Sequence, residues 1–206
     1  MKVLLINGSP KAKGNTRIAL DEMIKIFESE GVETELVQIG NKPIRGCIAC
    51  GNCFKMGKCA FNDVVNEVAP KFIEADGFVV GAPVYYGSPN GTIISFLDRL
   101  FFSTATFDKT GKVGAGIVIS RRGGSSSSFD VLNKYFAISN MPIATSQYWN
   151  MAYGMTPGEV VKDVEGLQTL RMLARNMTFL MKSIAAGKEQ FGYPEREQWV
   201  PTNFIR

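Results

Sequence analysis

The stretch that decides the fold is Lys2–Thr16, KVLLINGSPKAKGNT. Its first five residues, Lys2–Ile6, are mostly branched or aliphatic and too few for a helix, so they predict a strand buried on both faces. A cluster of turn residues follows, and then Asn15 and Thr16 can cap a helix. This succession predicts an anion cradle, because loop amides and a helix N-terminus direct unpaired N–H groups at a phosphate.

Two better-known phosphate loops do not fit the spacing. A nucleoside triphosphate loop has four residues between its glycines and then a lysine, whereas five residues separate Gly8 from Gly14 and Asn15 follows. The dinucleotide pattern needs a third glycine. A monophosphate site remains, and an ordinary turn that binds nothing explains this loop alone equally well. The side chains that would serve a phosphate are hydroxyls and lysines: Ser9, Lys11, Lys13 and Thr16.

Composition narrows the function. A chain of 206 residues can bury about 70% of its unfolded surface, enough for a full core. Histidine is absent, which excludes hydrolases with a histidine base and histidine-ligated metal sites. The net charge of +4 comes from scattered basic residues, so no nucleic-acid partner is expected. The first apolar run is too short for a signal peptide or a membrane span, so we predict a cytoplasmic protein without a membrane partner.

Strands alternate with helices along the chain. We expect strands at 2–6, 33–39, 77–81, 113–119 and 142–148, and helices at 15–30, 63–75, 92–104, 127–139 and 164–186. Pro70 should break or kink its helix. The alternation predicts a three-layer α/β/α fold around a five-stranded parallel sheet of order 2-1-3-4-5. Residues 1–187 form this domain, and 188–206 form a C-terminal arm whose Trp199 and Phe204 indicate packing on another surface, such as a second subunit.

Three loops rich in glycine, serine and proline follow strands 1, 3 and 4, and they meet at the sheet edge where strand order reverses. The first is the phosphate cradle. The second, Pro83–Gly87, offers a flat slot with tyrosines for stacking. The third, Ser120–Gly124, offers amides and two arginines. Each alone is more often a plain turn, but together they predict a site for flavin mononucleotide (FMN), which has one phosphate and a flat ring.

The sequences GSPKAKGNT, APVYYGSPNG and SRRGG resemble the NADPH-dependent FMN reductase family of flavodoxin-like proteins, over about residues 2–148. A compact Cys-x2-Cys-x2-Cys-x5-Cys run makes the chain most similar to the iron-sulfur flavoproteins. The resemblance implies a flavodoxin-like fold, bound FMN and a homodimer or homotetramer. It implies these cofactor-binding residues: Ser9, Lys11, Asn15, Thr16, Pro83, Val84, Tyr85, Tyr86, Gly87, Ser120, Arg121, Arg122, Gly123 and Gly124.

The cysteine-rich loop, residues 46–60, holds every cysteine of the chain: Cys47, Cys50, Cys53 and Cys59. In a cytoplasmic protein this clustering argues against disulfides and for thiolates that bind a metal. Gly51 and Gly57 let the loop close, so a 4Fe-4S cluster fits best. Zinc is a lesser fit because its cysteine pairs usually come from two separate knuckles, and an empty site is the third alternative. Because the loop follows strand 2, we expect it at the same edge as the flavin, one strand away.

We therefore predict an FMN-dependent oxidoreductase of the NAD(P)H reductase type. The flavin accepts electrons from a donor and passes them either through a 4Fe-4S cluster or directly to an acceptor. The donor is NAD(P)H or a ferredoxin-like protein, and the acceptor is a small molecule or a protein. Tyr86 and Arg121 are the predicted catalytic residues, for positioning and charge stabilisation. One alternative is a non-catalytic flavodoxin-type carrier, which the positive net charge disfavours. Another is a redox or metal sensor with a structural flavin.

Overall fold

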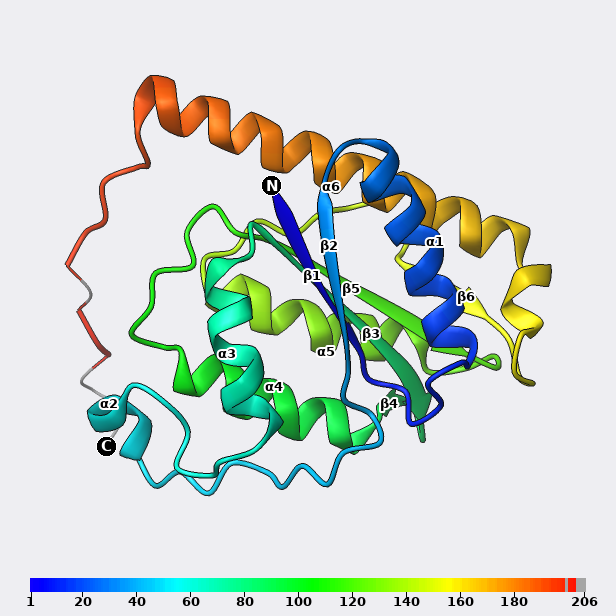
Figure 1. Ribbon diagram of the computed structural model, residues 1–206, viewed down its shortest axis with the longest axis horizontal. Helices are drawn as coiled ribbons and strands as arrows, with labels where there is room; N and C mark the ends of the chain where they lie inside the picture. The colour runs from blue at the N-terminus through cyan, green and yellow to red at the C-terminus, as the bar shows by residue number, and fades with distance from the viewer. Residues whose placement is uncertain (199, 203–206) are drawn as a thin grey trace.

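The computed structural model describes residues 1–198 and 200–202, and its sheet has the order β2-β1-β3-β5-β6 (Figure 1). The strands on this path are parallel: β1 (Lys2–Asn7), β2 (Glu33–Gln38), β3 (Gly77–Tyr85), β5 (Val113–Ser120) and β6 (Met151–Tyr153). A two-residue strand, β4 (Ser88–Pro89), pairs antiparallel with the end of β3. The predicted order 2-1-3-4-5 and the α/β/α class are confirmed.

Helices cover both faces of this sheet (Figure 1). They are α1 (Asn15–Ser29), α2 (Asn52–Met56), α3 (Val64–Glu74), α4 (Gly91–Ser103), α5 (Ser125–Ile138) and α6 (Val164–Phe191). Alternate side chains of β1 point to opposite faces. Val3 and Leu5 pack with α1 and α6, whereas Leu4 and Ile6 pack with α3, α4 and α5. Within the described residues no helix is long and apolar enough to cross a membrane.

The fifth strand lies further along the chain than predicted. The stretch 142–148 meets β5 only at one bridge, between Gly114 and Ile143. Its polar groups are bound to α6 instead, because the Ser146 hydroxyl donates to the Thr169 carbonyl (2.6 Å) and Asn176 donates to the Thr145 carbonyl (2.8 Å). Ladder pairing with β5 begins only at β6. The expectation of a strand at 142–148 is therefore wrong.

Two helices are more continuous than the sequence suggested. α3 runs through Pro70 without a break, and Val68 and Phe72 on either side of it are buried in the core. Burial of an apolar face contributes more to a short helix than intrinsic propensity, which outweighs the hydrogen bond that proline removes. α6 likewise continues through Gly187 and ends at Phe191, before the C-cap residue Gly192, which has a φ of 73°.

After α6 the chain runs back along the molecule toward α2 (Figure 1). Tyr193 packs on Gly111, where a Cβ would lie 2.2 Å from the tyrosine hydroxyl. Arg196 forms an ion pair with Asp108 at 2.5 Å. The described part of the arm thus lies on its own subunit, whereas Trp199 and Phe204, on which the prediction of an intersubunit arm rested, lie outside the described residues.

Lys112 is buried against the C-terminal end of α3. Its ammonium donates to the carbonyls of Ile73 (3.2 Å) and Ala75, and it lies 5.7 Å from the centroid of the Phe72 ring. Helix C-terminal carbonyls carry partial negative charge, which favours a cation there. Burial nevertheless lowers the pKa of Lys112 from 10.5 to about 8, because desolvation disfavours the charged form.

Replacing Lys112 with Met should remove a pH dependence of stability. The unfolded chain keeps this lysine protonated up to pH 10.5, whereas the folded chain releases the proton near pH 8. The free energy of unfolding contributed by Lys112 should therefore rise with pH across that window. We expect urea denaturation to show wild type gaining stability relative to Lys112→Met from pH 8 to 10. Lys134→Met, on the exposed face of α5, should keep the wild-type slope. A constant difference between wild type and Lys112→Met would contradict the assignment.

Candidate functional site

Buried amides fix the loop that follows β1. Asn7 is fully buried, and its Oδ1 accepts a hydrogen bond from the Ser9 backbone N–H (3.1 Å). The Asn7 amide donates to Gln38 Oε1 (2.5 Å), and Gln38 Nε2 donates to the Ser9 carbonyl (2.6 Å). These three residues form a closed polar ring under the loop. Sequence reasoning did not single out Asn7 or Gln38, since nothing in a lone strand-end amide distinguishes it from an ordinary turn residue.

Two further contacts hold the same loop from outside. The Asn90 side chain, at the start of α4, donates to the Gly8 carbonyl at 2.9 Å. Gly40 crosses the loop so closely that a Cβ there would lie 2.2 Å from the Ser9 carbonyl carbon. The cradle is therefore clamped between the end of β2 and the start of α4.

The N-terminus of α1 is left open. Gly14 occupies the N-cap position, and within the described residues no side chain caps this helix. The expectation that Asn15 caps it is wrong, because the Asn15 amide donates to the Thr156 carbonyl (2.9 Å) and its Oδ1 accepts from Val160 N–H (3.3 Å). The N–H groups of the first turn thus remain available to an anion.

The slot predicted after β3 is a β-hairpin. Tyr86 and Gly87 form its two-residue loop with φ values of 50° and 78°, and both lie in the left-handed region. This is the conformation of a type I′ turn, which favours Asn-Gly and disfavours tyrosine. Gly87 packs on Gly124, where a Cβ would lie 2.6 Å from the Gly87 Cα, and Ser127 Oγ donates to the Gly87 carbonyl (2.6 Å). These glycines join the two loops.

A cavity of about 200 Å³ opens between these loops. It brings together nine of the predicted residues: Ser9, Lys11, Asn15, Thr16, Pro83, Val84, Tyr85, Ser120 and Arg121. Five predicted residues do not line it: Tyr86, Gly87, Arg122, Gly123 and Gly124. Tyr86 instead projects into solvent. Five lining residues were not predicted: Gly14, Ile119, Gly154, Met155 and Pro157.

Most of the missed residues belong to the loop after β6. Gly154 N–H donates to the Ser120 carbonyl (2.9 Å), which ties this loop to the end of β5. The Glu159 carboxylate accepts from the backbone N–H groups of Thr156 (2.9 Å) and Met155 (2.8 Å), and these bonds lower its pKa. The loop is therefore a fourth ordered wall of the cavity. Sequence analysis missed this wall because it ended the fifth strand at residue 148, before the strand that precedes the loop.

The four cysteines line a second, narrow cavity of about 20 Å³. All are free thiols; Cys47 and Cys50 are exposed, Cys59 is half-buried, and Cys53 is buried with its Sγ 3.8 Å from the Phe102 carbonyl. Burial raises the pKa of the Cys53 thiol. Within the described residues no group of three or more Cys, His, Asp or Glu side chains is already placed to hold a metal. The donor set fits a thiolate-bound metal group, but the loop must draw its thiols together.

The cysteine cavity lies further from the first cavity than expected. Phe102 and Ser103, at the C-terminal end of α4, line it, whereas Asn90 at the other end of α4 holds the β1 loop (Figure 1). The 13 residues of α4 rise about 1.5 Å each, so about 20 Å separates its ends. The expectation of neighbouring sites one strand apart is therefore wrong for a single subunit.

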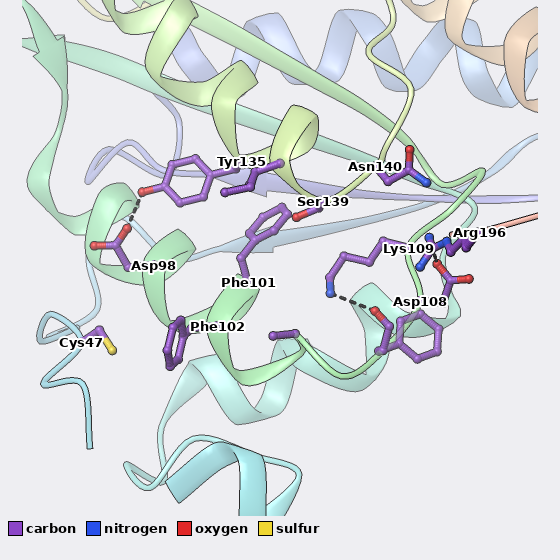
Figure 2. Close-up of a pocket in the computed structure, with 13 residues that line it drawn as sticks. Cys47, Asp98, Phe101, Phe102, Asp108, Lys109, Tyr135, Ser139, Asn140 and Arg196 are labelled. Atoms are coloured by element: carbon purple, nitrogen blue, oxygen red, sulfur yellow. Dashed lines mark hydrogen bonds and ion pairs between the residues drawn. The ribbon is translucent and has the colours of Figure 1, made fainter. Parts of the chain in front are cut away.

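A larger open groove, of about 600 Å³, runs beside the cysteine cavity, and Cys47 lies at one end of it (Figure 2). Aromatic rings of Phe101, Phe102 and Tyr135 line it. Tyr135 donates to Asp98 Oδ1 (2.5 Å), and burial together with this bond raises the tyrosine pKa. The other charged side chains of the groove, Asp108, Lys109 and Arg196, lie at the end away from Cys47 (Figure 2).

Comparison with known proteins decides the family. Residues 1–156 match the NADPH-dependent FMN reductase family. The chain belongs to this family. It is 33% identical over 191 residues to an iron-sulfur flavoprotein of Methanocaldococcus jannaschii, a match that covers 89% of this chain and 99% of that protein. The resemblance on which the predictions rested is confirmed. The protein described here is an FMN-dependent oxidoreductase, as predicted.

Solved structures agree on the fold. RosB with bound 8-demethyl-8-formylriboflavin-5′-phosphate is similar with a TM-score of 0.69 and 14% identity, covering 100% of this chain and 92% of RosB. A flavodoxin from the domain Archaea has a TM-score of 0.60 and 15% identity, covering 88% of this chain and 99% of the flavodoxin. At such identities the likeness shows the fold alone. The fold of this chain is thus flavodoxin-like, as predicted.

Replacing Gly40 with Ala should weaken FMN binding. The added Cβ would overlap the Ser9 backbone, which cannot give way without moving the cradle. Overpacking of this kind costs about 1–3 kcal/mol, so we expect the FMN dissociation constant to rise about tenfold or more. Flavin fluorescence titration of the apoprotein measures this. Gly187→Ala, which adds a Cβ in open space on α6, is the control and should bind FMN as wild type does. Equal affinities would show that the Gly40 contact does not shape the site.

Proposed function

We propose that FMN binds in the cavity between the loops that follow β1, β3, β5 and β6, with its phosphate at the N-terminus of α1. The observation that carries this proposal is the uncapped first turn of α1 opening into a polar cavity at the sheet's switch point. Ser9 and Thr16 supply hydroxyl donors, and Lys11 supplies positive charge. When bound, FMN supplies a ring that accepts electrons in pairs and releases them singly.

The residues around the expected ring have separate roles in this proposal. Tyr85 and Pro83 offer apolar surface along one wall of the cavity. Arg121 lines the same cavity and would stabilise negative charge there, so it keeps its predicted role in charge stabilisation. Arg122, Gly123 and Gly124 act through the loop backbone and its packing on the hairpin.

Tyr86 remains a proposed positioning residue for a different reason. A non-glycine residue in the left-handed region costs about 1–3 kcal/mol, and Tyr86 recovers none of this by burial. Backbone strain that no stabilising contact offsets is typical of residues that contact a ligand or partner. We propose that the exposed ring covers the flavin from the solvent side.

Replacing Tyr86 with Asn should separate stability from binding. Asn suits the first position of a type I′ turn, so we expect the FMN-free variant to gain about 1 kcal/mol in free energy of unfolding. The same variant should lose FMN more readily on dialysis, because no ring covers the site. Urea denaturation measures the first effect, and retained flavin per subunit the second. A stabilised variant that keeps all its FMN would remove Tyr86 from the site.

We further propose that the cysteines hold a 4Fe-4S cluster. Four free thiols line one cavity, and the aromatic rings of Phe61 and Phe102 shield it. Gly51 and Gly57 flank α2, both with a φ of 68°, which gives the loop two points at which it can fold. When bound, such a cluster supplies single-electron chemistry. Zinc and an empty site are the other outcomes of the test below.

The proposed donor is NAD(P)H or a ferredoxin-like protein, and the proposed acceptor is a small molecule or a protein. A chain without histidine suits hydride transfer, which depends on orientation over the ring more than on a protein acid. The net charge of +4 favours an enzyme over a flavodoxin-type carrier, because such carriers are typically acidic. The separation of the two sites along α4 is a reason to expect a homodimer or homotetramer, in which a second copy would bring them closer. Free thiols agree with a cytoplasmic location, which remains a prediction.

Anaerobically purified protein should contain one FMN with four iron and four sulfide per subunit, and it should oxidise NADPH or NADH when an acceptor is present. The flavin and cluster absorbance bands, with iron, zinc and sulfide analysis, distinguish the alternatives for the cysteines. Steady-state turnover distinguishes the enzyme from the carrier and the sensor. If the protein binds FMN but lacks iron, the proposal of a cluster is wrong and the FMN proposal stands. If it shows no turnover with NADH, NADPH or reduced ferredoxin, the proposal that it is an enzyme is wrong.

A further inference from the structure

Arg99 is the largest of the fully buried side chains in the described residues, with 1% of its surface exposed. It lies in the C-terminal half of α4 and lines the cysteine cavity. A buried guanidinium is destabilising unless its five N–H donors find acceptors. The positions of those acceptors therefore indicate what the residue is for.

Part of the guanidinium pairs with a carboxylate. Arg99 Nη1 and Nη2 donate to the two oxygens of Asp63 at 2.6 and 2.9 Å. Asp63 also caps α3 by accepting from Val65 N–H at 3.0 Å. Burial by itself would lower the pKa of Arg99, but its bonds to Asp63 and Cys59 raise it above the ordinary value, so the side chain is charged.

The other donors face one cysteine. Arg99 Nε and Nη2 each lie 3.3 Å from Cys59 Sγ. The backbone of Cys59 is held as well, because its N–H donates to Asn66 Oδ1 and its carbonyl accepts from Asn66 Nδ2, both at 2.9 Å. Cys47 and Cys50 are exposed by contrast. Cys59 is thus held at both the backbone and the sulfur, and it is the cysteine whose sulfur accepts from a charged donor.

The guanidinium also supports the loop around that sulfur. It donates to the carbonyls of Arg45 and Phe61, each at 3.4 Å. The Phe61 ring lies 4.5 Å from the Arg45 guanidinium carbon and 5.1 Å from that of Arg99. Cys59 is half-buried among these groups, and hydrogen bonds are stronger where the local dielectric is lower than that of water.

We infer that Arg99 is a positioning residue that presets Cys59 as the anchor ligand of the cysteine site and raises the reduction potential of the cluster bound there. Hydrogen bonds to ligating sulfur withdraw electron density and favour the reduced state. The inference rests on the proposed 4Fe-4S cluster and extends it to a residue that is not a ligand.

The test is an EPR-monitored redox titration of the full-length FMN-loaded protein and three variants. Arg99→Lys keeps the charge but loses the fork that reaches both Asp63 and Cys59, and we expect its cluster potential to fall. A tenfold change in the ratio of reduced to oxidised cluster corresponds to 59 mV for one electron. Asp63→Asn keeps an N-cap but leaves Arg99 uncompensated, so its potential should rise. Lys58→Gln removes an exposed charge next to Cys59 in sequence and should shift the potential least.

FMN content is the internal control, because the flavin site lies at the other end of α4. Variants that lose iron but keep FMN would support the anchoring role. Unchanged potentials at wild-type iron content, or shifts of the same sign in Arg99→Lys and Asp63→Asn, would overturn the inference while leaving the cluster proposal intact. If Arg99→Lys and Asp63→Asn both lose iron and FMN, Arg99 is required only for folding and the inference is wrong. A wild-type protein without iron would overturn the cluster proposal and the inference together.

Discussion

An anion cradle must leave backbone N–H groups unpaired in a protein where nearly every other buried one is satisfied. In this structure the loop after β1 is bound both through N–H groups, at Gly8 and Ser9, and through carbonyls. Gln38 holds the Ser9 carbonyl and Asn90 holds the Gly8 carbonyl, while Asn15 turns away to the loop after β6. The loop is therefore rigid, although the first turn of α1 has no side-chain cap within the described residues. Rigidity matters because an ordered cradle loses little entropy on binding.

The sequence could predict what depends on short-range patterns. Strand order followed from the alternation of buried strands and helices, and the loops after β1, β3 and β5 followed from runs of glycine, serine and proline at strand ends. Arrangements between distant residues could not be predicted in this way. The partners of Asn15, Thr156 and Val160, lie 141 and 145 positions further along the chain. The strand predicted at 142–148 is wrong because the polar groups of this stretch bind α6. An alternating pattern of apolar and polar residues does not show such a partner.

α4 connects the two candidate sites mechanically. Asn90 at its start fixes the cradle, and Arg99 and Phe102 near its end fix the cysteine loop. Between them Ile93, Phe96 and Leu100 are fully buried, so the helix is anchored to the core along its length. The cysteine spacing predicted a ligand set but not this attachment, because the loop and the helix are about 40 residues apart in the chain.

Both sites retain groups that stability alone would not favour. Tyr86 stands in a strained turn with its ring in solvent, and Arg99 places a charge where an apolar side chain would avoid desolvation. The two costs differ in kind. The strain at Tyr86 is local and could be relieved by one substitution, whereas Arg99 donates to Arg45, Phe61 and Asp63 and could not be removed without breaking the ion pair with Asp63. Hence the hairpin can change with little effect on the fold, but the cysteine loop and the start of α3 depend on one guanidinium.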